Sequence, residues 1–233
     1  MALYALSDTH LSFAVDKPMD IFGNRWKDHP QRIRYFWERK ITNEDTVILP
    51  GDISWGMSLK EALPDLLFLE SLPGTKILGK GNHDYWWDTV SKIERLLLKE
   101  HDATTIKLLY NNAFEVDDYA VCGSRGWFTE NASPSGTDFE KIVAREAGRV
   151  ARSLEAGKAL SKKESLVFLH FPPVMNDFIC REILDVLHAY GVKRCFYGHM
   201  HGVYNIPMTF TFEGIDFSIV AADHLQFDPL YIP

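Results

Sequence analysis

Cysteine is scarce in this sequence. The 233 residues include three cysteines, Cys122, Cys180 and Cys195, which are scattered along the chain and form no CxxC pair. Isolated cysteines in odd number are not typical of a disulfide framework or of a thiolate metal site. We therefore expect three buried thiols in a reducing compartment.

Long hydrophobic runs are also lacking, and we expect no signal peptide. No apolar run approaches the roughly 18 residues that a membrane span requires. The N-terminal segment has no basic region and reaches a charge at Asp8, which is too early for a signal peptide. These features predict a cytoplasmic protein that does not span a membrane.

Clusters of lysine and arginine are missing as well. The chain has 25 basic and 32 acidic side chains, which give a formal net charge of -7. A surface that follows the phosphates of a long nucleic acid needs clustered basic residues, so we do not expect a nucleic-acid partner. The charge allows a small anionic substrate in a locally positive site, and nothing in the sequence identifies a protein partner.

The overall composition is that of an ordinary globular protein. Hydrophobic residues make up 46% and charged residues 24% of the chain, which excludes disordered and collagen-like architectures. No repeat or linker interrupts the sequence. Since single α/β domains reach about 200 to 250 residues, we expect one domain over residues 1–233.

Short apolar runs alternate with helical patterns along most of the chain. Runs of this length, bounded by Gly, Pro or Asp, predict buried strands, and their alternation with helices predicts an α/β sheet covered on both faces. The expected strands are Ala2–Leu6, Thr46–Leu49, Lys76–Leu78, Leu166–Leu169 and Arg194–Tyr197. The expected helices are Gln31–Lys40, Leu59–Ser71, Thr89–Leu98, Asp138–Leu160 and Asp177–Tyr190.

Two segments break this alternation. Residues 106–122 and 203–220 have the pattern of successive strands, with turns expected at 111–112, 117–118 and 213–214. Two meanders beside an alternating core indicate two packed sheets. We therefore predict an α/β fold in which two mixed β-sheets are sandwiched between helices.

Polar side chains follow each expected core strand. Ligands of open α/β sheets bind outside the carboxyl ends of the strands, so we expect these five turns to converge. Two Asp, one Asn and four His suit a pair of divalent transition-metal ions, such as Mn, Fe or Zn, and suit Ca or Mg poorly. The seven donors are Asp8, His10, Asp52, Asn82, His170, His199 and His201.

Each of these turns has an ordinary structural explanation when it is taken alone. An Asp at a strand end, or a Gly-Asp pair, is more often a turn residue. A lone histidine such as His170 is more often structural. Coincidence explains five such turns poorly, because all of them occur in order and at strand ends.

Together the motifs D-x-H, G-D, G-N-H-D, H and G-H-x-H resemble those of the calcineurin-like metallophosphoesterases. The resemblance extends from Asp8 to His201 and implies a four-layer fold with two β-sheets between helices. Residues 51–55 and 123–127 resemble an uncharacterised bacterial branch of predicted phosphohydrolases. By matching motif, the resemblance implies that Asp8, His10 and His201 bind one metal, that Asn82, His170 and His199 bind a second, and that Asp52 bridges both.

The same resemblance implies an enzyme that hydrolyses phosphate esters. Two divalent ions about 3.5 to 4 Å apart can share a hydroxide and hold the phosphoryl group during in-line attack. We expect a dimetal phosphoesterase acting on small phosphodiesters or phosphomonoesters. The alternatives are a nuclease, a phosphoprotein phosphatase and a non-catalytic scaffold on the same fold. The acidic charge disfavours a nuclease, and the complete ligand set disfavours a scaffold.

Four residues have expected roles next to the metals. By resemblance, His83 faces the leaving group and stabilises charge there or donates a proton. Asp84 is expected to hydrogen-bond the His83 ring or to cap the following helix. Arg125, in a Gly-rich turn, either holds a phosphate oxygen or is a surface arginine. Asn82 is expected to contact substrate as well as metal.

Two further features leave alternatives open. Tryptophans follow two of the donor turns, at Trp55 and Trp86, and the Gly-rich turn of Arg125, at Trp127. They either pack in the core or line the mouth of the site. The polar loop 129–137 and the charged helix after it form either a solvated surface helix or a lip over the substrate.

Overall fold

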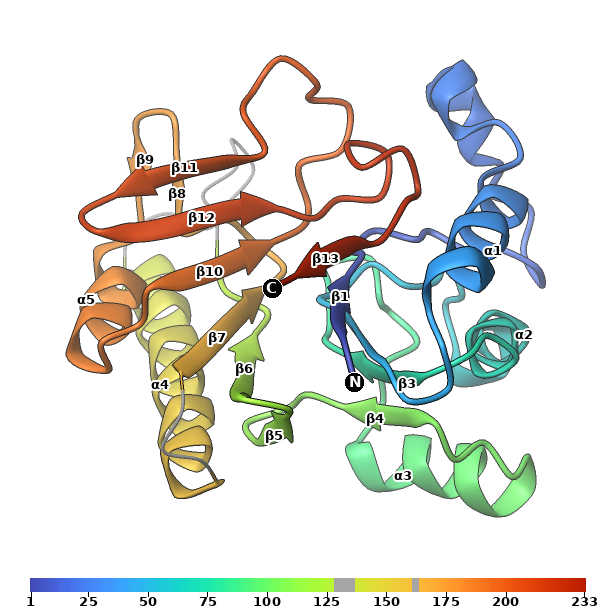
Figure 1. Cartoon of the computed structure of the whole chain (residues 1–233), viewed down its shortest axis with the longest axis horizontal. Coiled ribbons are helices and arrows are strands. Elements are labelled where there is room, and N and C mark those ends of the chain that lie inside the picture. The colour runs from blue at the N-terminus through green and yellow to red at the C-terminus, as the bar shows by residue number, and fades with distance from the viewer. Residues whose placement is uncertain (128–136, 161–163) are drawn as a thin grey trace.

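Two β-sheets face each other at the centre of the computed structural model, and helices cover their outer faces (Figure 1). The structure describes residues 1–127, 137–160 and 164–233. One outer layer contains α1 (His29–Lys40), α2 (Leu59–Glu70) and α3 (Val90–Glu94), and the other contains α4 (Thr137–Leu160) and α5 (Arg181–Ala189). The predicted fold, two mixed sheets between helices, is confirmed.

The first sheet has five strands in the order β13-β1-β2-β3-β4. Strands β1 to β4 are parallel, so the carboxyl ends of β1, β2 and β3 lie at one edge of the sheet. Strand β13 pairs antiparallel with β1 and was not expected from the sequence. The bounds are β1 (Leu3–Ala5), β2 (Thr46–Leu49), β3 (Thr75–Leu78), β4 (Ile106–Leu108) and β13 (Leu230–Ile232).

The second sheet has six strands in the order β11-β12-β10-β7-β6-β5. Its four inner strands are parallel, and β11 and β5 run antiparallel at the two edges. The hairpin β11–β12 turns at residues 213–214, as predicted. The bounds are β5 (Ala113–Val116), β6 (Tyr119–Ser124), β7 (Glu164–Leu169), β10 (Arg194–Tyr197), β11 (Thr209–Phe212) and β12 (Ile215–Ile219).

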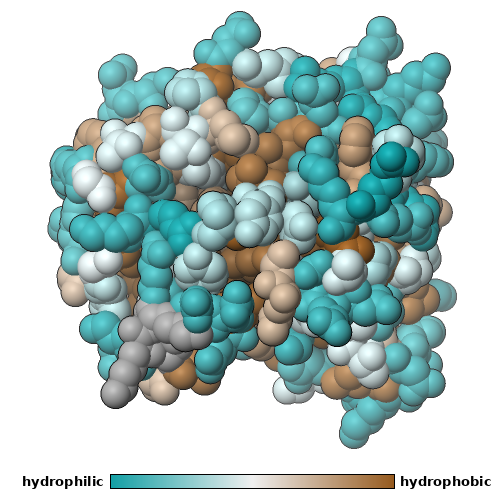
Figure 2. Space-filling model, in the orientation of Figure 1, coloured by the Kyte–Doolittle hydropathy of each residue, from teal (hydrophilic) through white to brown (hydrophobic). Residues whose placement is uncertain are grey.

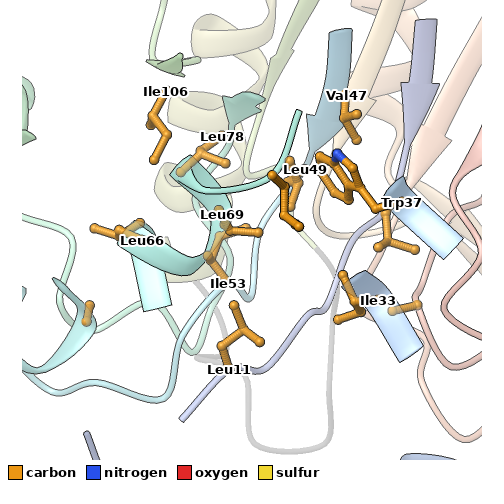
Figure 3. Packing of buried hydrophobic residues seen from close by; sticks show 14 of the residues in the cluster. Leu11, Ile33, Trp37, Val47, Leu49, Ile53, Leu66, Leu69, Leu78 and Ile106 are labelled. Carbon is orange, nitrogen blue, oxygen red and sulfur yellow. The ribbon is translucent and has the colours of Figure 1, made fainter. Parts of the chain in front are cut away.

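Apolar side chains pack in three layers, one between the sheets and one under each set of helices. In β2, Val47 and Leu49 face the helix layer that contains Ile33 and Trp37 of α1, as Figure 3 shows. Ile48 between them faces the second sheet. A strand buried on both faces needs an unbroken apolar run, which explains why these strands lack polar alternation.

The two sheets meet where their strands end. Ser7, just after β1, forms an isolated parallel bridge with Ala221, just after β12. The Ser7 N–H donates to the Val220 carbonyl at 2.7 Å, and the Ala222 N–H donates to the Ser7 carbonyl at 2.9 Å. These bonds bring the carboxyl ends of the parallel strands of both sheets together.

Two local expectations were wrong. The segment 106–122 is not one meander, because β4 joins the first sheet whereas β5 and β6 join the second; residues 111–112 therefore cross between sheets. The helix expected from Asp177 begins at Arg181. A hairpin of β8 (Val174–Met175) and β9 (Phe178–Ile179) precedes it, and strands of two residues are too short to show a sequence period.

Shorter helices complete the chain. The expected helix 89–98 consists of α3 followed by a π-helical segment, η3 (Arg95–Glu100), and two 3₁₀ helices, η1 (Met19–Phe22) and η2 (Asn24–Trp26), precede α1.

The surface and the cysteines agree with the composition. All three cysteines are buried and free. In the described part of the chain, no helix combines the length and the apolar character needed to cross a bilayer. Hydrophilic side chains dominate the periphery of the face in Figure 2, and hydrophobic ones show toward its middle.

Candidate metal centre

Acidic and histidine side chains from both sheets meet at the joined strand ends. One group contains Asp8, His10 and Asp52, and the other contains Asp52, His170 and His199. Within each group the ligand atoms all lie within 4.8 Å of one another. Since Asp52 belongs to both groups, it occupies the position that the sequence analysis predicts for a bridging ligand.

Asn82 and His201 complete the set of seven predicted donors. The Asn82 Oδ1 atom lies 2.7 Å from Nε2 of His170 and 3.1 Å from Nδ1 of His199. The His201 ring lies edge-on to the His10 ring, with 5.2 Å between the centroids. The structure therefore brings all seven donors to one place, although His201 lies outside both three-residue groups.

Left-handed backbone conformations direct several of these donors. Asp8, His10, Asp52 and His199 have φ angles of 58°, 43°, 53° and 66°. Asp and His tolerate this region better than most residues other than glycine, and such conformations concentrate at functional sites. Each of these turns follows a parallel strand and presents its side chain to the shared edge.

Two glycines allow the turns to approach this closely. A Cβ atom at Gly81 would collide with Oδ1 and the backbone nitrogen of Asp52. At Gly198 it would collide with Oγ of Ser7 and Oδ2 of Asp8. The glycines that precede Asn82 and His199 in the motifs are therefore required by packing against the two carboxylates.

The buried carboxylate of Asp84 organises the turns after β2 and β3. Its oxygens accept hydrogen bonds from the N–H groups of Asp52 (2.9 Å), Ile53 (2.8 Å) and Gly81 (2.7 Å) and from Nε1 of Trp86 (2.9 Å). It does not cap α3, because the N-cap of that helix is Thr89. The structure thus assigns Asp84 to positioning Asp52 and not to capping the following helix, while its hydrogen bond to the His83 ring stays a prediction.

His83 lies beside the donors. Its backbone N–H donates to Oδ1 of Asp52 at 2.8 Å. Its ring centroid is 4.6 Å from that of Trp55 and 5.7 Å from that of His10. Trp55 also stacks on His10 at 4.8 Å, so this tryptophan lines the centre, whereas Trp86 packs in the core.

Arg125 lies on the other side of the centre. Its carbonyl accepts hydrogen bonds from the N–H groups of His170 (3.0 Å) and Phe171 (2.9 Å). Its guanidinium lies over the Trp127 ring, 5.2 Å from the centroid. Both side chains are half-buried, so Arg125 is not a free surface arginine. The loop 129–136, expected as part of a lip, lies outside the described residues.

Burial disfavours the charged forms of the donors. It raises the pKa of Asp8 to about 8 and raises that of Asp52, to which repulsion by Asp8 and Asp84 adds. It also lowers the pKa of His10 and His170 well below the ordinary value for histidine. Nearby cations would stabilise the ionised carboxylates and the neutral imidazoles, which are the metal-binding forms.

The hydrogen bonding of the donors also fits a pair of metal ions. Both ring nitrogens of His10, Nδ1 of His170 and Oδ2 of Asp52 are buried and have no hydrogen-bond partner among the described residues. Buried polar atoms are nearly always satisfied, so these atoms need partners of another kind. Nitrogen and oxygen donors of this mixture suit divalent transition metals.

Asp223 is a buried residue near the centre that sequence reasoning missed. Its carboxylate accepts hydrogen bonds from the Gly202 N–H at 2.6 Å and the Tyr204 hydroxyl at 2.9 Å, and its charge adds to the rise in the pKa of Asp8. Asp223 belongs to none of the five motifs. The available signal was its place as the first charged residue after a strand, the same signal that identified Asp8.

Comparison with known proteins gives the family. The model of the calcineurin-like phosphoesterases matches residues 1–203. The chain belongs to the calcineurin-like phosphoesterase family. The match confirms the family resemblance that the motifs predict. It also supports the interpretation of the donor cluster as a candidate metal centre. No curated protein matched the sequence.

Two solved structures share the fold of this calcineurin-like phosphoesterase. The protein of unknown function AQ665 from Aquifex aeolicus is 17% identical, with a TM-score of 0.51, and the match covers 99% of this chain and 95% of that chain. The protein TT1561 of Thermus thermophilus is 11% identical, with a TM-score of 0.54, and the match covers 95% and 89% of the two chains. At these identities the similarity concerns the fold alone.

The first prediction is that metal affinity rises with pH up to about 8. Below its pKa of about 8, Asp8 holds a proton in the metal-free protein, and an ion must displace that proton to bind the carboxylate. His10 and His170 are already neutral in this range, so they release none. Each displaced proton should weaken binding by about tenfold per pH unit below the carboxyl pKa.

Calorimetric titration with Mn²⁺ at pH values of about 6, 7 and 8, in buffers of different ionisation enthalpy, measures both the affinity and the protons released. In Asp8→Asn, the number of protons released near pH 7 should fall by about one. An affinity that stays constant over this range would contradict the prediction.

The second prediction concerns Asp84. In Asp84→Asn, the side-chain NH₂ group replaces one of the carboxylate oxygens and faces backbone N–H donors, which then lack an acceptor. We expect the free energy of unfolding to fall by about 1 to 3 kcal/mol. Because these donors fix the turn of Asp52, Mn²⁺ affinity should also fall by about 10- to 100-fold. Urea unfolding and calorimetry measure the two effects.

Asp45→Asn is the matched control. Asp45 is buried and accepts backbone hydrogen bonds from Ala2 at 2.7 Å and Thr42 at 2.8 Å, at the amino-terminal end of β2. This variant should lose stability and keep its metal affinity. Equal loss of affinity in both variants would refute a specific positioning role for Asp84.

Proposed function

We propose that this protein is a dimetal phosphoesterase that hydrolyses small phosphodiesters or phosphomonoesters. The observation that carries the proposal is the pair of donor groups that share Asp52, in a chain of the calcineurin-like phosphoesterase family. Family membership supports a phosphoesterase in general, and the shared carboxylate supports two ions in place of one.

We assign each donor residue to one of the two proposed metal ions, and Asp52 to both. Asp8, His10 and His201 would hold the first ion, Asn82, His170 and His199 the second, and Asp52 both. Mn, Fe and Zn are the proposed metals, because imidazole and carboxylate donors together favour such ions over Ca or Mg. When bound, the two ions would lower the pKa of a water molecule for in-line attack on phosphorus and neutralise the phosphoryl oxygens.

His83 is the proposed acid for the leaving group. The hydrogen bond from the His83 backbone N–H to Asp52 fixes His83 beside the centre. Trp55 contacts both the ring of His83 and the ring of His10. From this place the imidazole can donate a proton to the oxygen that leaves phosphorus. Asp84 acts through Asp52 and does not need to contact substrate.

Substrate contacts are proposed for Asn82 and Arg125. Asn82 contacts the two histidines of the second ion, so its side chain borders the place where a phosphoryl oxygen would bind. Arg125 lies next to His170 and can hold a phosphate oxygen through its guanidinium. A net charge of -7 supports a small substrate over a nucleic acid, and the buried free cysteines support a reducing, cytoplasmic compartment.

The proposal is tested with metal-stripped protein reconstituted with Mn²⁺. We expect elemental analysis to give about two ions per chain, with hydrolysis of bis(4-nitrophenyl) phosphate and 4-nitrophenyl phosphate. Asp52→Asn should lower both the metal content and the rate. The proposal fails if neither ester is hydrolysed, or if one ion or fewer binds and Asp52→Asn changes nothing.

A further prediction separates His83 from the metal ligands. His83→Ala should lower kcat by about 10²- to 10⁴-fold, the range for a positioned acid, while the metal content stays near that of the unmodified protein. His199→Ala should lose metal as well as activity. If both variants lose metal equally, His83 is a ligand and its proposed role is wrong.

A further inference from the structure

A cavity of about 890 Å³ is lined in part by residues that neighbour the donors of the candidate metal centre. Its walls come from the segments after β3 and β6, from the crossing at residues 110–111 and from the first half of α4. Lys80, Arg125, Trp127, Arg145, Glu146 and Arg149 are the lining residues that matter for its chemistry. A volume of several hundred cubic ångströms is typical of sites for small organic ligands.

Two segments connect this cavity to the metal centre. Lys80 is separated from the donor Asn82 only by Gly81. The carbonyl of Arg125 accepts a hydrogen bond at 3.0 Å from the backbone N–H of His170, which is one of the seven predicted metal donors. The cavity therefore borders the side of the centre that contains Asn82 and His170.

The cavity is positive within an acidic protein. Among its described lining residues, four are basic and two, Asp88 and Glu146, are acidic, a net charge of plus two. Both acids already have partners: Asp88 pairs with Lys92 at 2.9 Å, and Glu146 accepts from the Ser124 hydroxyl at 3.0 Å and pairs with Arg149. Because Glu146 occupies Arg149, the positive charge that remains for a ligand is on Lys80, Arg125 and Arg145.

Two buried donors point to the kind of ligand. Nε of Arg125 and Nε1 of Trp127 are buried and have no hydrogen-bond acceptor among the described residues. Lys80, Arg125, Arg145 and Arg149 line the same cavity, so their positive charges lie near one another. An anion with several acceptor oxygens would satisfy the donors and relieve the repulsion among the cations.

We propose that this cavity binds a second phosphate group of the substrate. The inference rests on the proposed function: the ester of one phosphate is hydrolysed at the metal centre, while the other phosphate is held by Lys80, Arg125 and Arg145. The substrate class is a small molecule with two phosphates, joined either directly as a diphosphate or through an intervening group. The volume leaves room for the organic part beside the second phosphate.

The second phosphate does not react. In the hydrolytic step the oxygen of water bonds to the scissile phosphorus, the bond from that phosphorus to the leaving oxygen breaks, and the leaving oxygen gains a proton. The cavity contributes binding energy from a part of the substrate that does not change, which orients the scissile group at the centre.

Three adenosine nucleotides test the proposal on the Mn²⁺-loaded protein. AMP has one phosphate, ADP has a directly joined second phosphate, and adenosine 3′,5′-bisphosphate has a separate one. We would measure their binding by calorimetry and their inhibition of 4-nitrophenyl ester hydrolysis. At least one two-phosphate nucleotide should bind about tenfold or more tightly than AMP, since a charge-assisted contact contributes that much. Which of the two binds more tightly identifies the linkage.

Arg145→Gln tests the residues of the cavity. Arg145 is exposed on α4, so the substitution leaves the fold intact, and it should reduce the advantage of the two-phosphate nucleotide over AMP by about fivefold or more. Lys141→Gln is the control, because Lys141 is exposed one turn earlier on α4 and outside the cavity lining. It removes one positive charge and should leave the advantage unchanged.

The outcomes separate this inference from the function on which it rests. If no ester is hydrolysed, the proposed function fails. If the esters are hydrolysed and both two-phosphate nucleotides bind no more tightly than AMP, only the second-phosphate site is refuted. An advantage that Arg145→Gln and Lys141→Gln reduce equally would also refute it, because it would then reflect general charge.

Discussion

The candidate centre depends on one buried carboxylate that is not itself a donor to the metals. Asp84 accepts hydrogen bonds from the turns after both β2 and β3, and so fixes Asp52 against Gly81. Asp52 in turn accepts from the N–H of His83, which places that histidine. Hydrogen bonds from backbone N–H groups to these two carboxylates therefore set the distances between Asp52, the turn that carries Asn82, and His83. Side-chain packing alone would not hold the two turns to this accuracy, because turns lack the repeated hydrogen bonds of a sheet.

Burying this donor set has a free-energy cost, which either protonation of the carboxylates or bound cations can offset. Two carboxylates and several imidazoles are buried together, where burial disfavours every charged form. Four of the donors also have left-handed backbone conformations. A fold selected for stability alone would place apolar residues at these strand ends, as it does throughout the layer between the sheets. The polar centre is tolerated because three apolar layers surround it and because Ser7 and Ala221 join the two sheets beside it.

From the sequence it was possible to predict that these residues lie together, because parallel strands place their carboxyl ends at one edge, whatever the details of packing; their role as metal ligands stays a prediction. Asp8, Asp52 and Asn82 follow from that rule, and His170 and His199 follow from it in the second sheet. Other features depend on tertiary contacts. No local signal shows that residues 111–112 cross between sheets, that β13 returns to β1, or that Asp84 bonds to backbone 30 residues away in sequence. The basic cavity was hidden for the same reason, since its residues come from four separate segments.

Under the proposed function, the centre and the cavity attract phosphate within a protein of net negative charge. The chain has a net charge of -7, yet the described cavity lining is net positive and two bound divalent ions would add four positive charges next to it. Salt screens this positive potential beyond the Debye length, which is about 8 Å at physiological ionic strength. A ligand with one or two phosphates fits within that distance and gains attraction at both places. A polymer would extend beyond it, and its further phosphates would meet a protein of net charge -7, which supports the proposed small substrate over a long one.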